Sequence, residues 1–137
     1  MSRIKFNVAA KCDKAGRKEN QDNYWICPDL TRINDSFDSV IGRDEDLVLS
    51  DLGALLVVAD GMGGMNAGEK ASELVILGIK KAFASLPPWA LATDDGTLSF
   101  IRQAIVDADQ SVKDYAKAHP EAEGLGSTIV LLWPGEI

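Results

Sequence analysis

The sequence is poor in the residues that build disulfide frameworks, zinc sites and membrane spans. Its 137 residues include only two cysteines and one histidine, so neither a disulfide-stabilised secreted domain nor a Cys/His metal site is expected. No apolar run approaches the ~20 residues needed to cross a bilayer, and the N-terminal segment Met1–Phe6 lacks the apolar core of a secretion signal. We therefore expect a cytoplasmic chain with reduced thiols.

Basic residues are also scarce relative to acidic ones. The sequence has 14 Lys and Arg against 21 Asp and Glu, which gives a formal net charge of −7. A surface of this charge argues against nucleic acid or an anionic membrane as the partner. Hydrophobic residues make up 46% and charged residues 26% of the chain, which is usual for globular domains, and a chain of this length can bury a substantial core.

Apolar periodicity predicts the strands and helices. Two long amphipathic helices are expected, one capped by Asn66 and ended by Pro87, the other over Leu98–Ala118. Because the helices are grouped and do not alternate with the strands, the fold class is α+β. Strands are predicted at Ile4–Ala10, Asp22–Cys27, Leu47–Leu49, Ala54–Ala59 and Ser127–Trp133, with the third and fourth forming a hairpin.

The most informative segment is the glycine-rich turn that follows the apolar strand Ala54–Ala59. Asp60 comes directly after this strand and is followed by Gly61, Gly63 and Gly64. A carboxylate at the end of a buried strand is held rigidly, and glycines beside it let the main chain approach a cation or a phosphate closely. Taken alone, however, the pattern is also typical of an ordinary strand-to-helix turn in which Asp60 only caps.

Four segments that include this turn occur in order along the chain. They are Gly16–Asn23, Ala59–Gly64, Asn66–Ser72 and Gly124–Val130. Together they resemble the metal-dependent protein serine/threonine phosphatases, the PPM or type 2C family, in their bacterial form. The resemblance covers the chain from about residue 8 onwards and implies half of a β-sandwich flanked by helices. It identifies residues 1–137 as the N-terminal portion of a single catalytic domain that is longer in the family.

The resemblance implies a site for two Mg²⁺ or Mn²⁺ ions, which prefer hard oxygen ligands. Asp60 would bridge the ions, the Gly61 carbonyl would bind one of them, and Asp22 would ligate directly or through a water. Gln21 stands where many members of the family carry a glutamate ligand. Arg17 aligns with the arginine that binds the substrate phosphate, a role suited to a planar guanidinium. Asp60, Asp22 and Arg17 are thus the predicted catalytic residues, although singly Asp22 could cap a strand and Arg17 could be a solvated side chain.

Three further residues that could carry chemistry are assigned other roles. Met62 stands where eukaryotic members of the family have a histidine proposed as the general acid. His119 precedes Pro120 and is expected to cap a helix. Ser127 has no apparent adjacent base that would make it a nucleophile, so its segment is expected to support the site structurally.

The function implied by the resemblance is hydrolysis of phosphoserine and phosphothreonine monoesters on proteins by a metal-activated water, opposing a serine/threonine kinase. The family completes its metal site with two further aspartates, whereas the only acidic residue after Thr128 is Glu136. We therefore expect this piece to be inactive alone, and its uncovered sheet edges to favour pairing with a second copy. The alternatives are a non-catalytic regulatory or binding module and, less favoured because the turn lacks the lysine of a phosphate-binding loop, a phosphate-binding domain.

Overall fold

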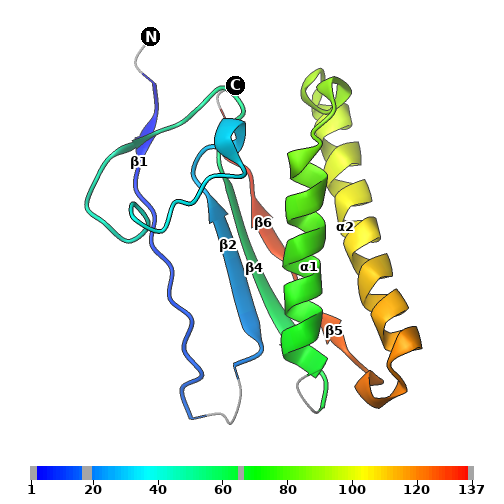
Figure 1. The fold of residues 1–137 in the computed structure, drawn as a ribbon. Coiled ribbons are helices and arrows are strands. Elements are labelled where there is room, and N and C mark those ends of the chain that lie inside the picture. The colour runs from blue at the N-terminus through cyan, green and yellow to red at the C-terminus, as the bar shows by residue number, and fades with distance from the viewer. Residues whose placement is uncertain (1–2, 17–19, 65–66, 136–137) are drawn as a thin grey trace.

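The computed structural model describes residues 3–16, 20–64 and 67–135. Its main unit is an antiparallel sheet with two helices packed on one face (Figure 1). The helices are α1 (Ala67–Ala84) and α2 (Asp94–Ala118), and they lie side by side. Three short 3₁₀ helices, η1 (Leu30–Arg32), η2 (Pro88–Leu91) and η3 (Pro120–Ala122), lie in the connections.

The sheet is organised around its longest strand, β4 (Leu55–Met62). On one side β4 pairs with β2 (Asp22–Cys27), and on the other with β5 (Gly126–Ser127) and β6 (Val130–Leu132), always antiparallel. A separate two-stranded sheet joins β1 (Lys5–Phe6) to β3 (Leu47–Val48). The α+β fold class predicted from the grouped helices is confirmed.

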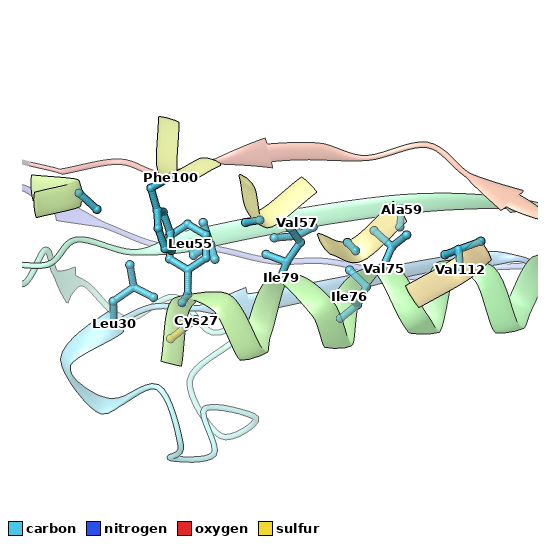
Figure 2. Close-up of a cluster of buried hydrophobic side chains, with 14 of the residues drawn as sticks. Cys27, Leu30, Leu55, Val57, Ala59, Val75, Ile76, Ile79, Phe100 and Val112 are labelled. Atoms are coloured by element: carbon cyan, nitrogen blue, oxygen red, sulfur yellow. The ribbon is translucent and has the colours of Figure 1, made fainter. Parts of the chain in front are cut away.

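The hydrophobic core lies between the sheet and α1. Alternate β4 residues Leu55, Val57 and Ala59 are at most 2% exposed, because in a strand every second side chain points to the same face. Figure 2 shows them facing Val75 and Ile79 of α1. Burying each large aliphatic side chain contributes about 1.5–3 kcal/mol, so this interface fixes the register of α1 on β4.

The second helix packs on the first and not on the centre of the sheet. Its buried residues, Phe100, Ala104, Ala108 and Val112, recur every four positions and form one stripe. Gly78 of α1 lies against this stripe, where an added Cβ would come within 3.0 Å of the Ala108 Cβ. The small residues therefore bring the helices close together, and Figure 1 shows α2 alongside α1.

Several predicted boundaries are wrong. The hairpin between residues 47–49 and 54–59 does not form, since β3 pairs with β1. The first strand covers only Lys5–Phe6, and the last is interrupted at Thr128 and Ile129 into β5 and β6. The second helix begins at Asp94, because the Thr93 side chain accepts a hydrogen bond from the Gly96 amide at 3.0 Å and caps the helix four residues early.

The face of the sheet away from the helices is open. Here β2, β4 and β6 expose apolar side chains that no described residue covers with a second layer. The exposed apolar side chains of the open face are Tyr24, Val58, Met62, Val130 and Leu132.

Within the described ranges, neither helix is long and apolar enough to cross a membrane.

Candidate metal centre

Two carboxylates lie opposite each other at one end of the open face. Asp22 of β2 and Asp60 of β4 are register partners, and both side chains are exposed. Cβ atoms of directly opposed residues in an antiparallel pair are about 4.5–5.5 Å apart, and like charges in such positions repel. None of the ion pairs found among the described residues includes either carboxylate. A cation between them would turn this repulsion into attraction.

Thr128 fixes the main chain of Asp60. The Asp60 amide donates to the Thr128 hydroxyl at 3.1 Å, and the Thr128 amide donates to the Asp60 carbonyl at 2.8 Å. Asp60 is therefore inside β4, with neighbours on both sides, and not at the end of a strand as predicted from the sequence. The two hydrogen bonds hold the main chain of Asp60 in place, and they give the Gly124–Val130 segment the structural role expected of it.

Gly61 is required by the approach of α1. A side chain at this buried position would overlap the carbonyl oxygen of Gly68 in the first turn of the helix. The Gly61 amide donates to the Gln21 carbonyl at 3.0 Å, which joins the turn to the start of β2. The glycine thus places the N-terminus of α1 next to Asp60, a contact that the sequence pattern alone did not specify.

The structure does not bring the Gln21 side chain to the two carboxylates. Its Nε2 donates to the Gly63 carbonyl at 3.0 Å, and an added Cβ on Gly68 would lie 2.6 Å from the Gln21 Cδ. Gln21 is therefore packed against the glycine turn on the helix side of the sheet. Arg17, the predicted phosphate ligand, lies outside the described residues.

The other candidate groups keep the roles predicted for them. The His119 amide donates to the Tyr115 carbonyl at 2.9 Å, and its ring stacks on Tyr115 with centroids 4.0 Å apart, so it is a helix cap. The Ser127 hydroxyl donates to the Thr128 carbonyl at 2.8 Å. Neither residue is bonded to the Asp22–Asp60 pair.

The donor chemistry suits a hard cation, but the donors are few. Carboxylate and main-chain oxygens are the ligands that Mg²⁺ and Mn²⁺ prefer. Within residues 3–16, 20–64 and 67–135, no cluster of three or more His, Cys, Asp or Glu could hold a metal ion. The pair is therefore part of a ligand set that further groups would have to complete.

Known proteins with related sequences are bacterial phosphatases. No family model matches the chain. The serine/threonine phosphatase stp of Listeria monocytogenes is 32% identical over 76 residues, which are 56% of this chain and 29% of that protein. Its Listeria welshimeri counterpart is also 32% identical over 76 residues, with the same shares.

Solved structures extend the similarity over the fold. The Mycobacterium tuberculosis serine/threonine phosphatase PstP matches 87% of this chain at 25% identity and a TM-score of 0.57, and a bacterial serine phosphatase variant matches 99% at 25% and 0.64. The resemblance to bacterial PPM-type serine/threonine phosphatases is confirmed. A PstP catalytic domain in complex with two manganese ions shares the fold at 22% identity and a TM-score of 0.58.

The chain spans less than half the length of each of these phosphatases. It covers 37%, 43% and 49% of the three solved chains and 29% of the Listeria proteins. More than half of each solved relative therefore has no counterpart among these 137 residues.

Proposed function

We propose that this chain is part of a Mg²⁺- or Mn²⁺-dependent protein phosphatase acting on phosphoserine and phosphothreonine, with a serine/threonine kinase as its counterpart. The observation that carries the proposal is the in-register pairing of Asp22 with Asp60 without a cationic partner among the described ion pairs. The manganese complex of a protein with the same fold supports it.

Each of the predicted site residues has a separate role in this proposal. Asp60 and Asp22 would hold the cations, and the Gly61 carbonyl would be a third ligand group. Thr128 keeps Asp60 in place through its two hydrogen bonds. Arg17 binds the substrate phosphate. When bound, divalent cations supply an activated water and neutralise phosphate charge.

The chain alone is proposed to be inactive. Two carboxylates and one carbonyl are too few ligand groups for tight binding of two Mg²⁺ or Mn²⁺ ions. The same observation favours a second candidate function, a regulatory or binding module that keeps the fold without turnover. Tight binding of a phosphopeptide without hydrolysis would identify it.

A cytoplasmic location is part of the proposal. The thiols of Cys12 and Cys27 are both free, and Cys27 is buried. Free thiols are usual in a reducing compartment.

The test is Mn²⁺ calorimetry combined with turnover of p-nitrophenyl phosphate in the same buffer. The proposal expects weak Mn²⁺ binding that is lost in Asp60→Ala, and no turnover by the isolated chain. Mn²⁺ binding that is equal in the wild type and in Asp60→Ala would contradict the assignment of the site. Turnover that depends on Asp60 would contradict the expected inactivity and show that a complete site forms.

A further inference from the structure

Gln21 is bonded to the glycine turn through both its main chain and its side chain. Its carbonyl accepts a hydrogen bond from the Gly61 amide at 3.0 Å, and its Nε2 donates to the Gly63 carbonyl at 3.0 Å. The two bonds hold the end of β4 at two points, one on each side of Met62. Gln21 also directly precedes Asp22 in the chain. One residue therefore links the start of β2 to the turn that follows the second carboxylate of the pair.

Gly63 depends on this side-chain bond because strand pairing does not reach it. Strand β4 ends at Met62, and Gly63 has a φ of 142°, a conformation that other residues rarely adopt. Glycine has more backbone freedom to lose than any other residue. The Gln21 side chain supplies the hydrogen bond that a neighbouring strand would otherwise give, and it fixes the direction of the Gly63 carbonyl.

The Gln21 side chain is itself held in place. It is half-buried, and a Cβ added to Gly68 would lie 2.6 Å from its Cδ and 2.8 Å from both its Nε2 and its Oε1. The main chain beside it is also fixed, since the Asp22 amide donates to the Asn20 side chain at 3.0 Å. The amide group is thus enclosed between the glycine turn and the first turn of α1, where it can act as a rigid support.

The main-chain bonding at Gly61 is one-sided. Opposed residues in an antiparallel pair exchange either both N–H···O bonds or none. The Gly61 amide donates to the Gln21 carbonyl, but among the main-chain bonds of residues 20–64 the Gln21 amide does not donate back to the Gly61 carbonyl. The half of the exchange that would occupy the Gly61 carbonyl is missing, and a carbonyl that binds a cation needs this freedom.

We propose that Gln21 is a positioning residue for the cation site and not one of its ligands. By bonding Gly61 and Gly63, it holds the turn so that the Gly61 carbonyl and the Asp60 carboxylate face the same cation. This inference rests on the proposed function, because it takes the Asp22–Asp60 pair as the metal centre. A ligand and a positioning residue respond to a carboxylate at residue 21 in opposite ways. An added ligand charge would strengthen cation binding, whereas a carboxylate cannot donate to the Gly63 carbonyl and would release the turn.

The experiment is an NMR titration of the chain with Mn²⁺ and Mg²⁺, comparing the wild type with Gln21→Met and Gln21→Glu. Methionine keeps the length of the side chain but has no N–H to donate. The Mn²⁺ affinity comes from the concentration at which the Asp22 and Asp60 amide signals broaden. The carbonyl carbon signal of Gly61 is followed with Mg²⁺, which is not paramagnetic. Both variants should bind Mn²⁺ about three- to tenfold more weakly, the effect of one lost hydrogen bond, and the Mg²⁺-induced shift at Gly61 should shrink.

Gln103→Met is the matched control. The Gln103 side chain makes a bond of the same kind, from its Nε2 to the Asp107 carboxylate at 2.8 Å, on the exposed surface of α2. Losing that bond should leave Mn²⁺ binding and the Gly61 signal unchanged. Thermal unfolding of each variant shows that the titrations are made on folded protein.

Two results would overturn the positioning role while leaving the metal centre intact. Tighter Mn²⁺ binding by Gln21→Glu than by the wild type would make Gln21 a ligand. A lower unfolding temperature in Gln21→Met, with wild-type Mn²⁺ affinity and a wild-type Gly61 shift, would make its bond only structural. A third result is different in kind: wild-type broadening that persists in Asp60→Asn would refute the proposed function itself, and the role of Gln21 with it.

Discussion

Neutralising Asp60 should stabilise the metal-free protein, although the side chain is at the centre of the proposed site. Asp60→Asn keeps the shape of the side chain and removes one of two like charges that face each other across β2 and β4. Two unit charges about 5 Å apart in water repel by ~0.8 kcal/mol. For a chain of this size, that free energy corresponds to a rise in the unfolding midpoint of about 2 to 4 °C.

Adding Mn²⁺ should make the wild type more stable than Asp60→Asn, which reverses their order in the absence of metal. At a Mn²⁺ concentration tenfold above the dissociation constant, binding to the folded state adds about 1.4 kcal/mol to the wild type. Asp60→Asn loses this gain, so the wild type becomes the more stable protein. Screening offers a second check, since at about 1 M salt the Debye length falls to ~3 Å and the metal-free difference should disappear.

The assay is thermal and urea unfolding at low and high salt, with and without Mn²⁺. Asp44→Asn is the control, because it makes the same change in net charge in an exposed loop. A double-mutant cycle with Asp22→Asn isolates the pairwise repulsion: the second neutralisation should add little once the first is made. If Asp60→Asn lowers metal-free stability, or matches Asp44→Asn under every condition, the paired-carboxylate account is refuted.

Three other predictions concern Gly61 and Thr128, next to the site, and Cys27, at the other end of β2. Gly61→Ala should destabilise the fold by about 2 to 4 kcal/mol in urea unfolding because its methyl group overlaps a main-chain oxygen of α1, whereas Gly64→Ala, with open space around it, should stay within about 0.5 kcal/mol; equal effects would contradict the close approach. Thr128→Val should weaken Mn²⁺ binding in calorimetry and lower the free energy of unfolding by about 1 kcal/mol, because the hydrogen bond to the Asp60 amide is lost. Thr128→Ser should restore both the binding and the stability. A serine variant that binds Mn²⁺ as weakly as the valine variant would show that the hydroxyl is not what matters. Burial raises the pKa of the Cys27 thiol above its usual 9.0, so the folded state keeps a proton that the unfolded state loses. The free energy of unfolding should therefore be constant below pH 9.0 and fall as the pH rises through it. Cys27→Ala should reduce this fall, and an unchanged pH profile would contradict the prediction.

The elements with strong local signals were predictable from the sequence. The apolar stripe of α1 and the apolar segment that becomes β4 gave both elements their correct type, and the resemblance pointed to Asp22 and Asp60. Their adjacency could not be read from the strands alone, because it depends on β2 pairing with β4 in one particular register. Register is set by which faces are buried, and this becomes evident only when α1 covers one side of the sheet.

The errors in prediction also have physical reasons. The loop around Gly53 looked like a hairpin turn, but β3 pairs with the distant β1, a long-range contact with no local signature. Thr93 capped α2 earlier than the apolar pattern suggested, because capping depends on a polar side chain outside that pattern. Gln21 was assigned to the metal because many members of the family carry a glutamate ligand at its place, and this assignment stays a prediction, although the Gln21 side chain donates to the Gly63 carbonyl in the structure.

The most direct test of a metal centre at the Asp22–Asp60 pair is to locate bound Mn²⁺ by paramagnetic broadening in the NMR spectrum of this chain, which does not require tight binding. If these carboxylates hold the ion, the amide signals of Asp22, Asp60, Gly61 and Thr128 should broaden first and together, and Asp60→Asn should abolish the effect. Broadening that begins in the acidic loop of residues 29–46, or that persists unchanged in the variant, would contradict a metal centre at the Asp22–Asp60 pair.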